Sequence, residues 1–351
     1  MDSPLIAGRY FREISLGEAD GRSHAIDIVA DDEPSLEWKP DVEAGLLRLI
    51  TEGGALFGER HYDRYKFLLT LSDHVAHFGL EHHQSSDNRL AGNLLTGPRA
   101  AASLGSLLPH EYVHSWNGKY RRPAGLATAN YDQPMDTEML WVYEGLTTYF
   151  GYVLAARSGL WSPEDFRSRV AERAAILDHR TGRTWRPLED TAVAAQVLYS
   201  ARQAWGDWRR GTDFYDEAAL IWLEADILLR QKSNERYSLN DFARRFYGGT
   251  SGGPAVLPYT LQDIVATLTE MVPNDWTRFF VERLNSTAAQ APLGGIEGSG
   301  WRLVYRDSRP EEGGAAGDSQ SADLQYSLGM SVEREGKIAD VSPNGPADKA
   351  G

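Results

Sequence analysis

Residues 110–114 read His-Glu-Tyr-Val-His, a pattern that places two histidines four residues apart. On a helix of 3.6 residues per turn this spacing points both imidazoles to one side, where they can bind one zinc ion. Glu111 cannot easily reach the same ion, so its carboxylate is placed to act as a general base on a water molecule beside it. The motif predicts His110 and His114 as metal ligands and Glu111 as a catalytic base.

A catalytic zinc ion needs a third protein ligand and one open position. The next segment with helical spacing, residues 140–149, supplies Glu144. The chain between the two segments is long enough to leave the first helix near Pro123 and to return antiparallel beside it. We therefore expect one Zn²⁺ per chain, bound by His110, His114 and Glu144. In the alternative interpretation the histidines cap a helix and Glu144 is a solvated charge.

Composition narrows the choice of ligands and partners. The chain has 351 residues, of which 42% are hydrophobic and 25% charged, as in a globular protein of two or three domains. Its formal charge of −14 has the wrong sign for binding nucleic acid or an anionic membrane. No cysteine is present, so any metal ion must be bound by His, Asp or Glu.

The hydropathy pattern predicts a soluble chain with no membrane span. No apolar run reaches the ~20 residues that a membrane-spanning helix needs. The first five residues, Met1-Asp2-Ser3-Pro4-Leu5, lack the basic and apolar stretches of a secretory signal. The compartment is therefore left open.

The pattern along the chain changes twice. Residues 1–40 alternate apolar and polar side chains, which is typical of strands. Residues 42–283 have the spacing of amphipathic helices, separated by clusters of Gly, Pro and Asp. The Gly-rich segment 311–319 is typical of an interdomain linker, and short strands are expected after it.

Four segments resemble a known family, and two of them carry the candidate metal ligands. His110-Glu111-Tyr112-Val113-His114-Ser115-Trp116-Asn117 and the Arg122-Pro123 that follows, together with residues 140–149, are similar to the metal-binding helices of the glycyl aminopeptidases. These gluzincin metallopeptidases join an N-terminal β domain, a thermolysin-like zinc-peptidase domain and a C-terminal PDZ domain. The resemblance implies a multidomain α+β fold whose catalytic domain is mainly α-helical.

The same resemblance implies boundaries for the domains. Residues 1–40 correspond to the end of the β domain, 41–290 to the catalytic domain and 291–320 to a β segment and linker. Residues 321–351 correspond to part of a PDZ domain, in which Tyr326-Ser327-Leu328-Gly329-Met330 resembles the carboxylate-binding loop. The chain is thus expected to be truncated at both ends. The resemblance also implies a bacterial source, with a secreted or periplasmic full-length form left open.

Residues 78–85, Phe-Gly-Leu-Glu-His-His-Gln-Ser, resemble the family's edge strand beside the substrate. The resemblance implies that Glu81 binds the free α-ammonium of the substrate and that Gly79 and Leu80 lie along the peptide. Without the resemblance, a single glutamate in such a strand is a surface charge.

Residues 213–226 resemble the helix on which the family carries a tyrosine opposite the zinc ion. The resemblance implies that the Tyr215 phenol stabilises the oxyanion of the reaction. The segment departs from the common Tyr-Tyr-x-Lys-Gly form, because Phe214 replaces the first tyrosine and Glu217-Ala218 replace Lys-Gly. Tyr199 is therefore an alternative candidate, and Tyr215 could instead be a packing residue.

We expect a zinc-dependent aminopeptidase that hydrolyses the N-terminal peptide bond of peptides with a free N-terminus. The resemblance implies a preference for small first residues such as Gly or Ala, and a complete PDZ domain would bind a C-terminal peptide. Three alternatives remain at this point. They are a thermolysin-type endopeptidase, a peptide-binding PDZ protein with a vestigial catalytic domain, and a zinc hydrolase for a non-peptide substrate.

Overall fold

The structure is a computed structural model of the chain, and it describes residues 4–130, 132–198, 205–250, 252–306, 322–333 and 336–351. It is a mixed α+β fold with two compact units. The first unit comprises Met1–Ala127, Thr147–Phe166 and Tyr237–Met271. The second comprises Thr128–Leu146, Arg167–Arg236 and Val272–Gly351. The division falls inside helix α5 (Gly145–Ser158), so one continuous helix contributes residues to both units.

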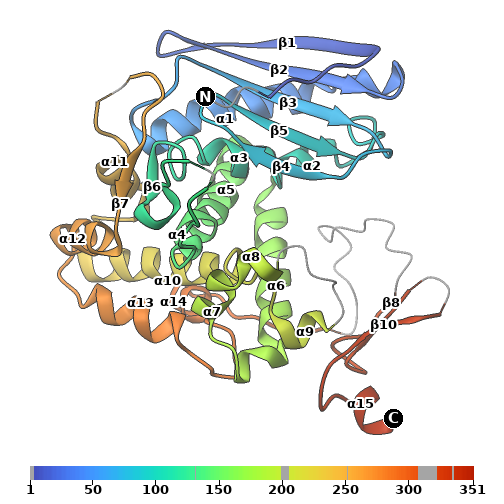
Figure 1. Cartoon of the computed structure of the whole chain (residues 1–351), viewed down its shortest axis with the longest axis vertical. Coiled ribbons are helices and arrows are strands. Elements are labelled where there is room, and N and C mark those ends of the chain that lie inside the picture. The colour runs from blue at the N-terminus through green and yellow to red at the C-terminus, as the bar shows by residue number, and fades with distance from the viewer. Residues whose placement is uncertain (1–3, 131, 199–204, 251, 307–321, 334–335) are drawn as a thin grey trace. The chain divides into compact units, whose positions relative to one another are not determined.

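A five-stranded sheet organises the first unit (Figure 1). β1 (Tyr10–Ala19) and β2 (Arg22–Ala30) are antiparallel, and β3 (Arg64–Leu71) is parallel to both β2 and β5 (Ser85–Leu90). β4 (Phe78–Glu81) is antiparallel to β5 and lies at the edge of the sheet. The edge strand expected within residues 78–85 is confirmed for Phe78–Glu81, whereas Ser85 begins β5 in the interior of the sheet. The strands in spatial order are β1, β2, β3, β5 and β4.

The helical spacing expected over residues 42–283 did not reveal β3 and β5. β3 is mostly buried, with a continuous apolar run at Phe67–Leu69, and parallel partners lie on both of its sides. A strand of this kind lacks the alternation that identifies half-exposed strands. Because β2 pairs with β3, the strands before residue 40 form one sheet with those after it. That residues 1–40 are also the end of a longer β domain stays a prediction.

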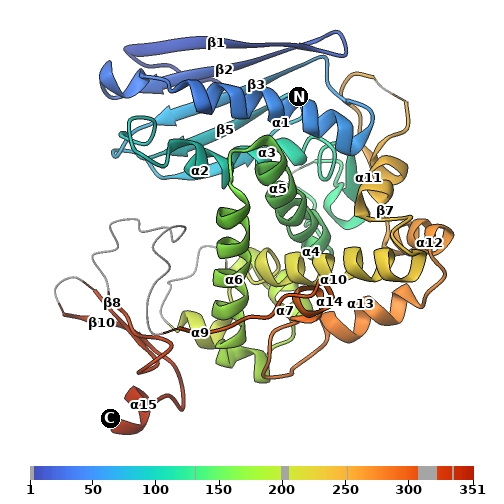
Figure 2. The ribbon, with the colours of Figure 1, turned by 180° about the vertical axis from the view of Figure 1, so that it is seen from behind.

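Helices and a small parallel ladder complete the first unit. Figures 1 and 2 show α1 (Pro40–Phe57) along one face of the sheet, and its buried side chains include Val42, Leu46 and Leu49. Other elements of this unit are α2 (Ala100–Gly105), α3 (Leu108–Val113), most of α5, α11 (Leu239–Tyr247), α12 (Leu261–Met271), β6 (Arg121–Pro123) and β7 (Leu257–Tyr259).

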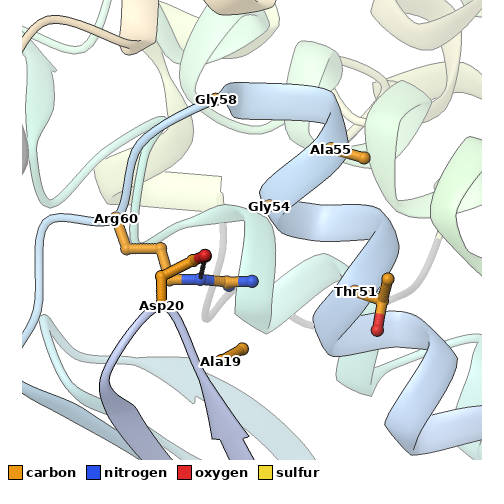
Figure 3. A pocket seen from close by; sticks show the side chains of 7 residues that line it. All are labelled: Ala19, Asp20, Thr51, Gly54, Ala55, Gly58 and Arg60. Atoms are coloured by element: carbon orange, nitrogen blue, oxygen red, sulfur yellow. Dashed lines mark hydrogen bonds and ion pairs between the residues drawn. The ribbon is translucent and has the colours of Figure 1, made fainter.

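A buried polar network supports α3 from within the first unit. The guanidinium of Arg60 is 2% exposed and donates to the hydroxyls of Tyr62 at 2.9 Å and Tyr112 at 2.7 Å. It also pairs with Asp20 at 2.9 Å, at the wall of a cavity of about 270 Å³ (Figure 3). Because Tyr112 belongs to α3, the network fixes that helix to the sheet side of the unit. The cavity is lined by Ala19, Asp20, Thr51, Gly54, Ala55, Gly58 and Arg60.

The second unit is built around α10 (Asp216–Ser233). Its Trp222 is fully buried. The centroid of its ring lies 5.5 Å from that of Trp141, on which it stacks, and 5.0 Å from that of Phe280, so this tryptophan belongs to the core. α10 and α13 (Trp276–Leu284) lie side by side in both views (Figures 1 and 2). The unit also contains α4 (Leu140–Tyr143), most of α6 (Pro163–Asp178), α7 (Leu188–Val193), α8 (Ala195–Leu198), α9 (Gly206–Arg209) and α14 (Gly294–Gly298).

The predicted β segment at 291–320 needs a correction. Its described part, residues 291–306, contains α14 and no strand. Gly294 and Gly295 allow the backbone of α14 to approach α10. A Cβ added at either glycine would lie 2.6 Å from an atom of Glu224. The linker expected at 311–319 lies outside the described residues.

The last described residues form a small sheet in the order β10-β9-β8. Its strands are β8 (Ala322–Asp323), β9 (Met330–Val332) and β10 (Ile338–Val341), and α15 (Pro346–Ala350) follows. That this segment is part of a PDZ domain stays a prediction. Within the described ranges, no helix is long and apolar enough to cross a lipid bilayer.

A pH-dependent loss of stability follows from the buried His24 of β2. Burial, with a smaller contribution from the Arg60 charge, lowers its pKa from 6.5 to about 4. The unfolded chain therefore binds this proton first, and stability is lost as the pH falls from 6.5 to about 4. We expect His24→Gln to remove about 2 kcal/mol of the stability difference between pH 7 and pH 5, measured by urea unfolding. Equal pH dependence in both proteins would contradict this assignment.

Candidate metal centre

The two histidines of α3 face each other. Their Nε2 atoms lie 3.1 Å apart, and their rings are nearly perpendicular, at 83°. Two nitrogens bound to one tetrahedral zinc ion at ~2.0–2.1 Å stand about 3.3 Å apart, so the pair has the spacing of a shared ion. α3 starts at Leu108-Pro109, where proline fits the first turn of a helix.

This helix is shorter than the sequence suggested. It ends at Val113 with His114 as its C-cap, and residues 121–123 form β6 rather than the last turn of a helix. Gly118 has φ of 129°, which a residue with a side chain rarely adopts, and Lys119 N–H bonds to the carbonyl of His114 at 2.9 Å. The chain therefore turns sharply after the second histidine.

That turn orients His114. Its Nδ1 lies 2.9 Å from the backbone carbonyl of Asn117, which accepts the Nδ1 proton and leaves Nε2 for a metal ion. Asn117 is fully buried, and its amide donates to Thr147 Oγ1 at 3.0 Å. On the other imidazole, His110 Nδ1 lies 3.5 Å from Thr148 Oγ1. Each ring thus has a partner on the nitrogen opposite the site.

The helix that carries these threonines begins next to Glu144. Glu144 lies between α4 and α5, and Thr147 and Thr148 follow it by three and four residues, on the same face of the helix. Candidate ligand atoms of His110, His114 and Glu144 lie within 4.8 Å of one another. Two imidazoles and one carboxylate are the donor set of catalytic zinc sites, so these residues fit the ion.

Two glycines allow other elements to approach α3. A Cβ on Gly79 of β4 would lie 2.0 Å from Glu111 Oε1 and 2.8 Å from Leu107 Cδ1. A Cβ on Gly151 of α5 would lie 3.2 Å from the Cα of His110. The Glu111 carboxylate therefore lies directly against the backbone of the edge strand.

Glu81 lies at the end of this edge strand. Oxygens of Glu81 and Glu111 and a nitrogen of His114 lie within 4.8 Å of one another. The Lys119 ammonium pairs with Glu81 Oε1 at 3.3 Å, and both side chains are mostly buried. The structure thus places Lys119 beside the predicted amine-binding carboxylate. Leu80 is 47% exposed on the same strand.

Tyr215 is half-buried and immediately precedes α10. The start of this helix packs on the residue that follows Glu144, because a Cβ on Gly145 would lie 2.2 Å from Ala218 Cβ and 2.9 Å from the Phe214 carbonyl oxygen. The role of Tyr215 stays a prediction. The alternative Tyr199 lies outside the described residues.

Sequence reasoning missed the residues that orient the ligands. They are Asn117, Thr147 and Thr148. The pairing of Lys119 with Glu81 was also not predicted. The signal for the threonines is their spacing of three and four residues after Glu144, which places them on its helix face. Nothing in the sequence shows that Asn117 uses its backbone carbonyl.

Solved structures share this fold. An aminopeptidase N family protein from Idiomarina loihiensis is 20% identical, with a TM-score of 0.65, and the match covers 82% of this chain and 49% of that one. A mutant two-domain M1 zinc metallopeptidase bound to L-arginine is 14% identical, with a TM-score of 0.50, and the match covers 80% and 53%. The chain thus spans about half the length of each. Both similarities concern the fold.

The sequence match is more specific. Residues 103–221 match the family model described as M61 glycyl aminopeptidase. This segment contains His110, Glu111, His114, Glu144 and Tyr215, and the match confirms the resemblance stated from the sequence. A search of curated proteins found no match. The matched segment thus shows where this chain is similar to that family, and it spans the candidate metal centre.

Removal of either imidazole tests the metal centre. We expect about one zinc ion per chain in the native protein and less than about 0.1 in His110→Ala or His114→Ala, because two of three protein ligands cannot hold the ion. Elemental analysis of dialysed protein measures this. His179→Ala is the matched control, because it changes an exposed histidine directly after α6. This variant should bind zinc as the native protein does. Full zinc in both α3 variants would contradict the assignment.

Proposed function

We propose that the chain is a zinc-dependent aminopeptidase that hydrolyses the N-terminal peptide bond of its substrate. The observation that carries this proposal is the arrangement around α3. Candidate ligand atoms of His110, His114 and Glu144 lie within 4.8 Å of one another, and Glu111 lies next to His114, against the edge strand that ends at Glu81. Candidate metal ligands, a candidate base and a candidate amine-binding carboxylate thus lie close together, which supports the proposal.

His110, His114 and Glu144 are the residues that would hold zinc. The bound ion would supply Lewis acidity for the scissile carbonyl and would lower the pKa of a water molecule. Glu111 accepts the proton of the attacking water and delivers it to the leaving amine. Its burial and its contact with the backbone at Gly79 support this role, because they hold the carboxylate in one position.

Glu81 provides the reason for cleavage at the first bond. A substrate ammonium bound by this carboxylate fixes the first residue, so that only the bond after it lies near Glu111. The position of Glu81 at the end of edge strand β4 supports this role, since an edge strand can pair with an extended peptide. A preference for Gly or Ala as the first residue belongs to this proposal and rests on the family resemblance.

Tyr215 is proposed to donate a hydrogen bond to the oxyanion that forms at the scissile carbonyl. A phenol can do this without ionising near neutral pH. Support comes from the packing of its helix start on Gly145, the neighbour of Glu144. Peptides with a free N-terminus are accordingly the proposed substrates.

Amide substrates separate an aminopeptidase from an endopeptidase. We expect chelator-sensitive release of a chromophore from glycyl and alanyl amides, and no release from their N-acetylated forms, which lack the ammonium. Glu81→Gln should lower kcat/KM for the free amines by about 10²-fold, because it removes a charge-assisted interaction. Glu18→Gln, in the exposed part of β1, is the matched control. Equal cleavage of acetylated and free substrates would instead identify an endopeptidase.

The contact of Gly79 with Glu111 gives a second test. Gly79→Ala should retain zinc and fold but lower kcat by about 10²-fold or more, since the new Cβ must displace the base from its position. Zinc analysis, circular dichroism and steady-state kinetics measure the three properties. Gly252→Ala is the control, because a Cβ there meets no atom within 4 Å. Unchanged kcat in Gly79→Ala would show that the close contact has no catalytic role.

A further inference from the structure

Three arginines and two carboxylates form a buried cluster at the start of α10, which we call the arginine clamp. Asp213 pairs with Arg180 at 2.5 Å and with Arg210 at 2.8 Å. Glu217 pairs with Arg210 and with Arg183. The side chains of Arg210, Arg183, Asp213 and Glu217 are 0%, 2%, 4% and 1% exposed. These four side chains are therefore almost entirely shielded from water, and Arg180 is partly exposed.

The clamp lies on both sides of Tyr215. Asp213 stands two residues before it and Glu217 two residues after it, and Arg210 bridges the two carboxylates. The backbone between them is also fixed, since Glu217 N–H bonds to the Asp213 carbonyl at 2.9 Å. A further bond joins Tyr215 N–H to the Thr212 carbonyl at 3.1 Å. Both flanks of the tyrosine are thus tied to the same arginine.

The arginines come from two segments that approach closely. Arg183 belongs to the 3₁₀ turn Thr181–Thr184, and Arg210 directly follows α9. A Cβ on Gly182 would lie 2.4 Å from the Trp208 carbonyl oxygen, so glycine is required for this approach. The glutamate at 217, where the family frequently has lysine, is explained by these partners, because a lysine would place a third cation against Arg183 and Arg210.

Stability alone does not account for such a cluster. Burying charges is costly, and well-packed apolar side chains often stabilise a core as well or better. What ion pairs add is direction, because a guanidinium bonds two carboxylates only in a fixed geometry. The directed contacts here converge on one short segment, the segment that carries Tyr215.

We propose that the arginine clamp is a positioning device that fixes Tyr215 for its role at the oxyanion. This inference rests on the proposed function for the catalytic role of Tyr215. Arg210 is the central positioning residue, since in the described part of the chain it is the arginine that pairs with both flanking carboxylates. Loss of the clamp leaves the phenol chemically intact but free to move, so it weakens an interaction made only in the transition state.

Kinetics test the proposal through a double-mutant cycle. Tyr215→Phe should lower kcat about 10²-fold, and Arg210→Met at least tenfold, each with KM within about twofold. The double variant should be no slower than Tyr215→Phe, because the clamp acts only through that hydroxyl. Arg283→Met, which breaks a separate ion pair to Glu224 on the same helix, is the matched control and should keep its kcat. Multiplying losses in the double variant would overturn the proposal.

A second readout does not depend on activity. Fluorotyrosine placed at position 215 alone should give one narrow ¹⁹F resonance in the native protein and in Arg283→Met. Arg210→Met and Arg180→Met should broaden or split it. Arg180 is 21% exposed and, of the two clamp carboxylates, pairs with Asp213. Arg180→Met is therefore the milder variant. If Arg210→Met does not fold, the spectrum of Arg180→Met decides the test. An unchanged narrow resonance in folded Arg180→Met would overturn the proposal.

The two readouts separate the two ideas. If Tyr215→Phe keeps full kcat, the catalytic role of Tyr215 in the proposed function is wrong, and the fluorine spectra alone decide whether the clamp fixes the segment. If Tyr215→Phe is slow and the spectra of the clamp variants are unchanged, the proposed function stands and the clamp proposal fails.

Discussion

The metal helix is held between two backbones that can approach it only because they carry glycine. Gly79 of β4 lies against the Glu111 carboxylate, and Gly151 of α5 lies against the Cα of His110. α3 has six residues, too few to be stable on its own. Its existence, and with it the spacing of the two imidazoles, depends on these contacts. The site is therefore a product of close backbone packing as much as of its ligands.

Residues of α3 have two different roles: some line the candidate site, and others anchor the helix to the rest of the unit. His110, Glu111 and His114 belong to the site, whereas Tyr112 is fully buried and bonds to Arg60 and Tyr62. This division follows from helical geometry, since the spacing of four that unites the histidines leaves Tyr112 on another face. The buried network anchors the helix without occupying any group that the chemistry needs.

In the second unit, the segment around Tyr215 is held by ion pairs as well as by a close backbone contact at a glycine. The arginine clamp fixes the residues around Tyr215, and Gly145 lets α10 start against the residue after Glu144. Ion pairs suit this task because they are directional, while apolar packing tolerates small rotations. Close backbone contacts at glycine therefore occur in both units, and around Tyr215 buried ion pairs are added to them.

The sequence by itself predicted the candidate ligand pair, the candidate base and the helical character of α10, because these depend on spacing within one element. It also identified β4 as an edge strand through a family motif. It did not reveal β3, whose continuous burial removes the alternation of a strand, nor the end of α3 at Val113. Only the tertiary structure brought Lys119 to Glu81 and the carbonyl of Asn117 to His114. Such contacts join backbone atoms and distant residues, for which a sequence pattern carries no periodic signal.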